Sequence, residues 1–236
     1  MQARFEAAYH EAEQYYWLPR ARRKLVLRLL KKLATPGARI LDIGCSGGLL
    51  LTELNQCGFT NVIGIDKSKK AVELCTHRGL NVYQMDGSSP GFASSSFEFI
   101  IAACVLEHIR DDLQALRNWH GLLKPAGRLI LIVPAFQALY SSLDRASGHF
   151  RRYSKAEAIF KLLAAGFKVT RFSYLNTVSL PFMVLRKVLN SRGDFIKLPR
   201  SLNSILYYAL TLENRLNPRL PGASMLFIAA ATNKYH

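Results

Sequence analysis

A chain of 236 residues, half of them hydrophobic, is long enough for one α/β domain with an elaboration. Its four cysteines show no C-x-x-C spacing, which argues against a structural zinc site or a disulfide framework, and no apolar run reaches the ~20 residues that cross a bilayer. The 32 Lys and Arg against 16 Asp and Glu give a net charge of +16, which favours an anionic partner.

Apolar periodicity and turn residues predict strands that alternate with helices along most of the chain. In chain order the predicted elements are helices over 3–16 and 19–33, a strand over 38–43, a helix to about 57, a strand over 61–65, a helix capped by Ser68 to 77, strands over 80–85 and 97–104, a helix over 111–123, a strand over 128–133, a helix opened by Ser154 and ending near 166, and strands over 167–175 and 224–232. This alternation predicts a seven-stranded, mostly parallel sheet with helices on both faces and an antiparallel last strand.

The glycine-rich turn at residues 44–48 is the most informative stretch. It follows a buried strand and opens a helix, so its backbone N–H groups can approach a ligand closely. Asp42, at the strand end before the turn, can accept a hydrogen bond from that ligand. The spacing does not fit the G-x-G-x-x-G dinucleotide fingerprint, so the loop alone leaves a dinucleotide and S-adenosylmethionine both open.

The next strands also end in residues that suit an adenosyl ligand. Asp66 ends the second strand and can grip ribose hydroxyls, while Asp86 ends the third and can accept from an adenine amine. The fourth strand ends in small residues around Ala103, where a ligand has room to lie. The ligand is therefore expected at the carboxyl ends of these strands.

In these pieces the chain resembles a class I S-adenosylmethionine-dependent methyltransferase of type 11 or 12. The matching stretches are LDIGCSGG (41–48), GIDKS (64–68), QMDGSS (84–89), FEFIIAACVLEHI (97–109) and LLKPAGRLILIVP (122–134), in the family's order and at its spacing. The resemblance implies a Rossmann-like fold with S-adenosylmethionine as cofactor. It implies cofactor contacts from Asp42, Gly44, Cys45, Ser46, Gly48, Asp66, Lys67, Asp86, Gly87 and Ala103. Ser46 stands where the family has glycine, and we expect the loop to survive because serine is small.

Positive charge is concentrated outside the cofactor-binding core. Residues 40–144 hold eight Lys and Arg against ten Asp and Glu, so the flanking segments carry the whole positive excess. We interpret this distribution as a basic surface around the substrate entrance that faces an anionic partner. The alternative is a basic surface that is only solvated and has no specific partner. We expect a single domain with N-terminal helices over 1–37, a cofactor-binding core over 38–175, an insertion over 176–222 and a last strand over 223–236.

The insertion at 176–222 is rich in both apolar and basic residues. Residues 181–189 and 202–210 have the pattern of two amphipathic helices. A lid that packs on the core is the favoured interpretation; contact with an anionic membrane surface and a dimer face are the alternatives. With no apolar leader segment at the N-terminus, we expect a cytoplasmic protein, peripheral at the inner face of the membrane if that contact exists.

Two clusters offer a base for the methyl acceptor. His108 follows the fourth strand beside Glu107, and His149 lies in the element D…GH-x-RRY (144–153), which resembles a subset of the family associated with envelope sugars. Arg151, Arg152 and Tyr153 of this element suit an anionic acceptor.

No metal site is expected. Some related O-methyltransferases hold a metal with the equivalent acid and His and with another acid three residues earlier. Here that earlier position is Cys104.

The predicted function is methyl transfer to an oxygen or nitrogen acceptor on a small or lipid- or glycan-type anionic substrate. An RNA methyltransferase is one alternative, because it too uses a basic rim, although the chain has no Asn/Asp-Pro-Pro-Tyr/Phe element after the fourth strand. A non-catalytic scaffold that binds S-adenosylmethionine is another, since the acidic residues report binding and not turnover. The sequence leaves the oligomeric state open.

Overall fold

The computed structural model describes residues 13–188, 198–216 and 220–232. Its strands are β1 (Ile40–Ile43), β2 (Val62–Asp66), β3 (Val82–Gln84), β4 (Phe97–Ala103), β5 (Leu123–Pro134), β6 (Phe167–Leu175) and β7 (Ser224–Ala231). Its α-helices are α2 (Trp17–Leu33), α3 (Leu49–Gln56), α4 (Lys69–His77), α5 (Asp112–Leu122), α6 (Ser142–Ser147), α7 (Lys155–Ala164), α8 (Leu180–Val188) and α9 (Arg200–Leu216).

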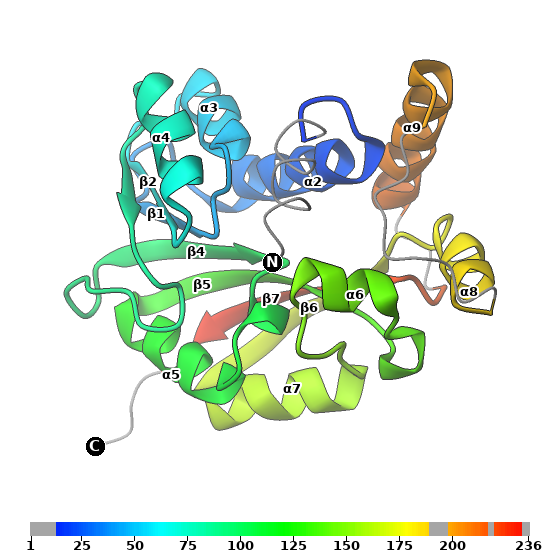
Figure 1. The fold of residues 1–236 in the computed structure, drawn as a ribbon. Helices are drawn as coiled ribbons and strands as arrows, with labels where there is room; N and C mark the ends of the chain where they lie inside the picture. Colours follow the sequence, from blue (N-terminus) through cyan, green and yellow to red (C-terminus); the bar gives the residue numbers. More distant parts are fainter. Residues whose placement is uncertain (1–12, 189–197, 217–219, 233–236) are drawn as a thin grey trace.

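The seven strands form one sheet in the order β3-β2-β1-β4-β5-β7-β6. Strands β1 to β5 pair in parallel, and β7 lies antiparallel between β5 and β6. Because helical connections join the parallel strands, helices cover both faces: α2, α3 and α4 lie on one side of the sheet and α5 and α7 on the other (Figure 1). The predicted Rossmann-like fold is confirmed.

Successive side chains of the central strands point to opposite faces of the sheet, and this divides the hydrophobic core in two. In β5, Leu129, Leu131 and Val133 pack with the helices α5 and α7, whereas Ile130 and Ile132 pack with α2 and α3. A strand buried on both faces has to be apolar throughout, and β5 is so over residues 129–134. The two cores hold the strand ends rigidly, which fixes the positions of the side chains at the carboxyl edge.

The helix α6 was not predicted, β3 is shorter than the predicted 80–85, and two further element predictions differ from the structure. Strand β5 begins at Leu123 instead of 128, because the Pro125-Ala126-Gly127 turn is accommodated as an irregularity in the pairing between β4 and β5. Ala126 takes a positive φ of 61° there. The helix predicted over 3–16 lies mostly outside the described residues, and residues 13–15 form a turn before α2 begins at Trp17.

The insertion forms two helices, as predicted, and α9 packs on α2. Leu210 is buried against Trp17 and Ala21, and the Arg20 guanidinium lies 4.2 Å from the ring centroid of Tyr207. The carboxylate of Glu213 accepts hydrogen bonds from the backbone N–H groups that begin the insertion, at 177 and 178. Among the described helices none combines the length and the apolar content needed to traverse a bilayer.

Candidate functional site

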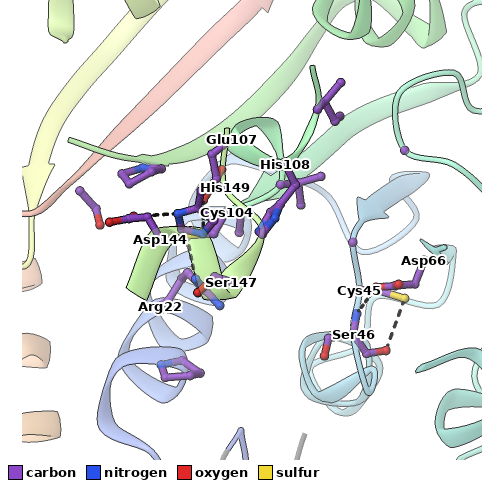
Figure 2. A pocket seen from close by; sticks show the side chains of 18 of the residues that line it. Arg22, Cys45, Ser46, Asp66, Cys104, Glu107, His108, Asp144, Ser147 and His149 are labelled. Atoms are coloured by element: carbon purple, nitrogen blue, oxygen red, sulfur yellow. Dashed lines mark hydrogen bonds and ion pairs between the residues drawn. The ribbon is translucent and has the colours of Figure 1, made fainter. Parts of the chain in front are cut away.

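A cavity of about 1360 Å³ lies at the carboxyl ends of β1, β2, β4 and β5. Figure 2 shows its two ends: Cys45, Ser46 and Asp66 gather on one side, and a cluster of histidine and acidic side chains gathers on the other. The site therefore forms where the predicted ligand was expected, at the carboxyl edge of the parallel strands.

The glycine-rich turn approaches the cavity with its backbone. Gly44 has φ +71°, and a Cβ there would lie 2.5 Å from Val105 Cγ2, so the position requires glycine. Ser46 adopts φ 50°, the conformation that the family's glycine would take freely, which agrees with the expectation that the loop survives. Its hydroxyl donates to Glu13 Oε2 at 3.1 Å, a contact that glycine could not make.

Asp66 joins this loop to the next helix. One carboxylate oxygen accepts the backbone N–H of Ser46 at 3.0 Å and the other accepts that of Ser68 at 2.9 Å. Each oxygen keeps a further lone pair, and the residue lines the cavity. Asp66 thus holds the loop in place while it presents acceptors to a ligand.

Three carboxylates gather at this end. Asp42 is buried, and burial first, then the negative charges of Glu13 and Asp66, raise its pKa to about 8, against the opposing charge of Arg22. A ligand that carries positive charge would relieve this repulsion and favour the ionised Asp42. The residues at this end therefore fit a cationic ligand such as an adenosyl sulfonium.

The remaining predicted cofactor residues divide into two groups. Cys45, Lys67, Asp86, Gly87 and Ala103 line the cavity, whereas Gly48 does not. Asp86 accepts the backbone N–H of Ser88 at 2.7 Å, and this bond, followed by the Ser88 hydroxyl, lowers its pKa. Gly48 lies behind the loop, where a Cβ would meet Leu80 and Cys75, so its role is to let the turn pack.

The opposite end holds Glu107, His108, His149 and Asp144. His149 Nδ1 lies 2.9 Å from Asp144 Oδ1, and its Nε2 lies 4.0 Å from Glu107 Oε1. The rings of His108 and His149 meet edge to face, 4.6 Å between centroids. Burial, followed by the neighbouring His149, lowers the pKa of His108 to about 3, so its imidazole is neutral.

Two carboxyl groups in this cluster have pKa values shifted in opposite directions. Burial raises the pKa of Glu107 from its ordinary value. Burial acts the same way on Asp144, but the hydrogen bond from His149 and the Arg152 guanidinium outweigh it and hold the pKa at about 2. Asp144 is therefore a permanent anion that orients the His149 ring.

The basic residues of the GH-x-RRY element mostly brace the loop. Arg152 lines the cavity, and its Nε donates to Asp144 Oδ1 at 2.9 Å. Arg151 and the hydroxyl of the buried Tyr153 both donate to Asp112 Oδ2, and neither residue lines the cavity. The structure does not bring the substrate residues Arg151 and Tyr153 to the site.

Several cavity residues were not predicted from the sequence. Glu13 comes from the N-terminal segment. Arg22, in a run (15–23) for which the sequence left cofactor cover and helix packing both open, also lines the cavity and donates to Cys104 Sγ at 2.8 Å. Phe182 and Met183 of α8 add an apolar wall. Their sequence signal was weak, since an aromatic or basic residue in an amphipathic helix is equally typical of ordinary packing.

Comparisons with known proteins agree with this geometry. Residues 10–171 match the family model of a methyltransferase domain. A ubiquinone biosynthesis O-methyltransferase of Xanthomonas campestris pv. campestris (strain B100) is 32% identical over 147 residues, which cover 57% of this chain and 56% of that protein. The chain thus spans little more than half the length of this curated relative.

Two solved structures share the fold. An S-adenosylmethionine-dependent methyltransferase from Mesorhizobium loti is 16% identical with a TM-score of 0.61, and the match covers 87% of this chain and 95% of that one. A SAM-dependent methyltransferase from Archaeoglobus fulgidus is 17% identical with a TM-score of 0.60, covering 94% and 99%. At such low identity the likeness extends to the fold alone.

Proposed function

This chain belongs to the methyltransferase-domain family, and from that premise we propose that it is an S-adenosylmethionine-dependent methyltransferase that methylates a hydroxyl oxygen on an anionic, lipid- or glycan-type acceptor. The observation that carries the proposal is the arrangement of one cavity with a loop-lined acidic end and a histidine end. The name of the O-methyltransferase relative favours oxygen over nitrogen as the acceptor atom.

The acidic end would hold the cofactor. S-adenosylmethionine, when bound, supplies a methyl group on a positively charged sulfur. Asp42 would neutralise that charge, Asp66 would accept from ribose hydroxyls, and Asp86 would accept from the adenine amine. The backbone at Gly44 and Ser46 lines the cavity at this end and would lie against the nucleoside.

The histidine end would receive the acceptor. Asp144 accepts the Nδ1 proton of His149, so Nε2 carries the lone pair and is available to an acceptor hydroxyl. The acceptor oxygen would take the methyl group that bound S-adenosylmethionine would supply, and the hydroxyl proton would leave at this cluster. We assign to His149 the activation of the acceptor oxygen, with His108 packed against it.

An amphipathic acceptor is supported by the cavity wall. Phe182 and Met183 of α8, with Leu139 and Leu143, form an apolar side, while Arg110 and Arg152 line the same end with positive charge. A phosphate- or carboxylate-bearing group linked to a lipid would match both features.

We further propose that α8 and α9 contact an anionic lipid surface. Leu202, Ile205, Tyr208, Leu212 and Leu216 are all exposed and recur every three or four residues, so they form a row along the solvent side of α9. The exposed basic residues Lys187, Arg200 and Arg215 lie on the same two helices. Because α8 also walls the cavity, this surface would deliver a lipid-linked acceptor to the histidine end.

The test is to incubate the protein with S-adenosylmethionine labelled in its methyl group and a fractionated lysate. We expect label in the lipid extract, on an oxygen. Label in RNA would support the alternative of an RNA methyltransferase, and no label in any fraction would support a binding scaffold; either result would overturn the proposal.

The first variant to measure is His149→Ala. Loss of the group that activates the acceptor should lower kcat by roughly 100-fold or more. Cofactor affinity should stay within about twofold in calorimetry, because His149 lies at the other end of the cavity. His77→Ala removes an exposed histidine of α4 and is the matched control. Full activity in His149→Ala would remove this residue from the mechanism.

A further inference from the structure

Glu107 is the least satisfied buried acidic side chain among the described residues. Its side chain is fully buried, and neither carboxylate oxygen has a hydrogen-bond partner. His149 Nε2 lies 4.0 Å from Oε1, beyond hydrogen-bond distance. A buried carboxylate without hydrogen-bond partners is costly, and its place in a cavity wall allows a cationic ligand to compensate it.

Both neighbouring histidines have one ring nitrogen already committed. His149 Nδ1 faces Asp144 Oδ1 at 2.9 Å, and His108 Nδ1 faces the carbonyl oxygen of Gly148 at 3.2 Å. Carboxylate and carbonyl oxygens only accept hydrogen bonds, so each Nδ1 carries the hydrogen and each Nε2 carries the lone pair. This is the second-sphere arrangement that prepares histidines to bind metal ions.

The three side chains lie close enough to share one ion. One donor atom from each of Glu107, His108 and His149 lies within 4.8 Å of the other two. Bonds of about 2.0–2.1 Å in a tetrahedral site place donor atoms about 3.4 Å apart, so side-chain rotation of roughly an ångström would close the set. Figure 2 shows the three converging at the histidine end of the cavity.

We propose that Glu107, His108 and His149 bind a divalent transition-metal ion of the zinc class. Two imidazoles and one carboxylate select such an ion over Mg²⁺ or Ca²⁺, which prefer oxygen ligands. Three protein ligands leave a coordination position open toward the cavity, as in catalytic zinc sites. The sequence argument against a metal counted a ligand lost at Cys104; in the folded chain His149 supplies a third donor from a different loop.

This inference deepens the proposed function and rests on it in one respect, the entry of the acceptor hydroxyl at this cluster. A hydroxyl bound at the open position would have its pKa lowered by the cation, and its proton would pass to solvent. His149 would then activate the acceptor hydroxyl through the ion bound at its Nε2, in place of accepting the proton itself, with Asp144 as its positioning residue.

The experiment uses the full chain without a tag, stripped with a chelator and dialysed. It is titrated with Co²⁺ and with Zn²⁺, by visible absorption for Co²⁺ and by calorimetry for both. We expect one equivalent of each ion to bind, with the absorption bands of Co²⁺ in a low-symmetry nitrogen and oxygen site. Absence of binding at this stoichiometry would overturn the inference.

Variants locate the ion. His149→Ala and His108→Ala should each weaken binding at least roughly 100-fold, because each removes a ligand. His77→Ala should bind as the wild type does, and so should Cys75→Ser, which tests the buried thiols near the glycine-rich turn as a competing site. Unchanged affinity in His149→Ala, or loss in Cys75→Ser, would overturn the assignment.

A measurement on the unaltered protein avoids any folding defect of the variants. Zinc should shift the imidazole ¹⁵N signals of two histidines at their Nε2 atoms, and no shift would contradict the inference.

Failure of the proposed function is separable from failure of the metal site. Metal bound as described with no labelled hydroxyl product would overturn the function alone; full methylation of a hydroxyl by the stripped protein would overturn the metal's role alone.

Discussion

At the scale of single residues, the site depends on charges held in unusual surroundings. Asp42 and Glu107 are both buried carboxyl groups whose pKa is raised by burial, and they stand at opposite ends of the cavity. Asp144 is also buried, but His149 and Arg152 keep it ionised. Carboxyl side chains thus differ in their properties from place to place because their neighbours differ.

The raised pKa of Asp42 predicts pH-dependent cofactor binding. A cationic ligand favours the ionised carboxylate, so below its pKa of about 8 part of the binding free energy is used to remove the proton. We expect the ratio of wild-type affinity to Asp42→Asn affinity to rise with pH, by up to about tenfold per unit, and to level above about 8. Calorimetry on both proteins measures it, and titration of the cofactor's own amino group cancels in the ratio.

The same residue sets the sign of a stability effect in the cofactor-free protein. Between its ordinary pKa of 3.8 and its folded value of about 8, Asp42 binds more protons in the native state than in the unfolded one. Its contribution to the free energy of unfolding therefore falls as pH rises through this window. Asp42→Asn should remove that decline in denaturant titrations; an identical slope in both proteins would contradict the assignment.

At the scale of elements, α9 presents two unlike faces. One face is buried on α2 through Leu210, and the other exposes a row of large apolar side chains. An apolar row on the solvent side of a helix, accompanied by basic residues, is typical of surfaces that bind lipid. Packing on α2 explains the apolar residues on the buried face of α9, and the proposed lipid contact would explain those on its exposed face.

The lipid contact predicts the behaviour of a triple variant in α9. Replacing Ile205, Tyr208 and Leu212 by serine should lower binding to vesicles that contain phosphatidylglycerol by roughly tenfold, because apolar area would no longer be buried. Vesicle flotation measures it. Phe160→Ser, which removes an exposed aromatic residue from α7, is the matched control.

The lipid composition provides the second comparison. Vesicles of phosphatidylcholine alone should bind the wild type less well, since they offer no negative charge to the basic residues. Equal flotation of the triple variant and the wild type, or equal flotation with neutral and anionic vesicles, would show that α9 does not make this contact.

At the scale of the whole molecule, the sheet places the proposed cofactor end and the proposed acceptor end of the cavity on different strands. The cofactor end rests on β1, β2 and the glycine-rich turn, whereas the histidine end follows β4 and β5. The two ends are built on different strands of one rigid sheet, so substitutions at one end should leave the other intact.

Asp66→Ala tests this separation from the cofactor end. It removes the acceptor that holds the backbone N–H groups of Ser46 and Ser68 and the partner proposed for the ribose. We expect cofactor binding to fall below detection in calorimetry and the free energy of unfolding to drop by about 1–3 kcal/mol. Metal binding at the histidine end should persist. Unchanged cofactor affinity would refute the ribose role.

Much of the fold could be predicted from the sequence. Central strands such as Leu129–Val133 are apolar at every position, the glycine-rich turn has few structural alternatives, and Ser68 and Ser154 cap helices as expected. These signals are local, because they depend on propensity and on hydrogen bonds within a few residues. The start of β5 was misplaced because pairing with β4 overrode the Pro-Gly turn signal.

The sequence by itself determined the methyltransferase fold, the acids at the strand ends and the candidate histidines, since each follows from residue order along one element. Only the tertiary structure decided which of them meet. It brought His149 to Glu107 and His108 across some forty positions of chain, and it turned Arg151 and Tyr153 away toward Asp112. The physical reason is that burial and distance between remote segments are set by packing of the whole sheet, which no local pattern encodes.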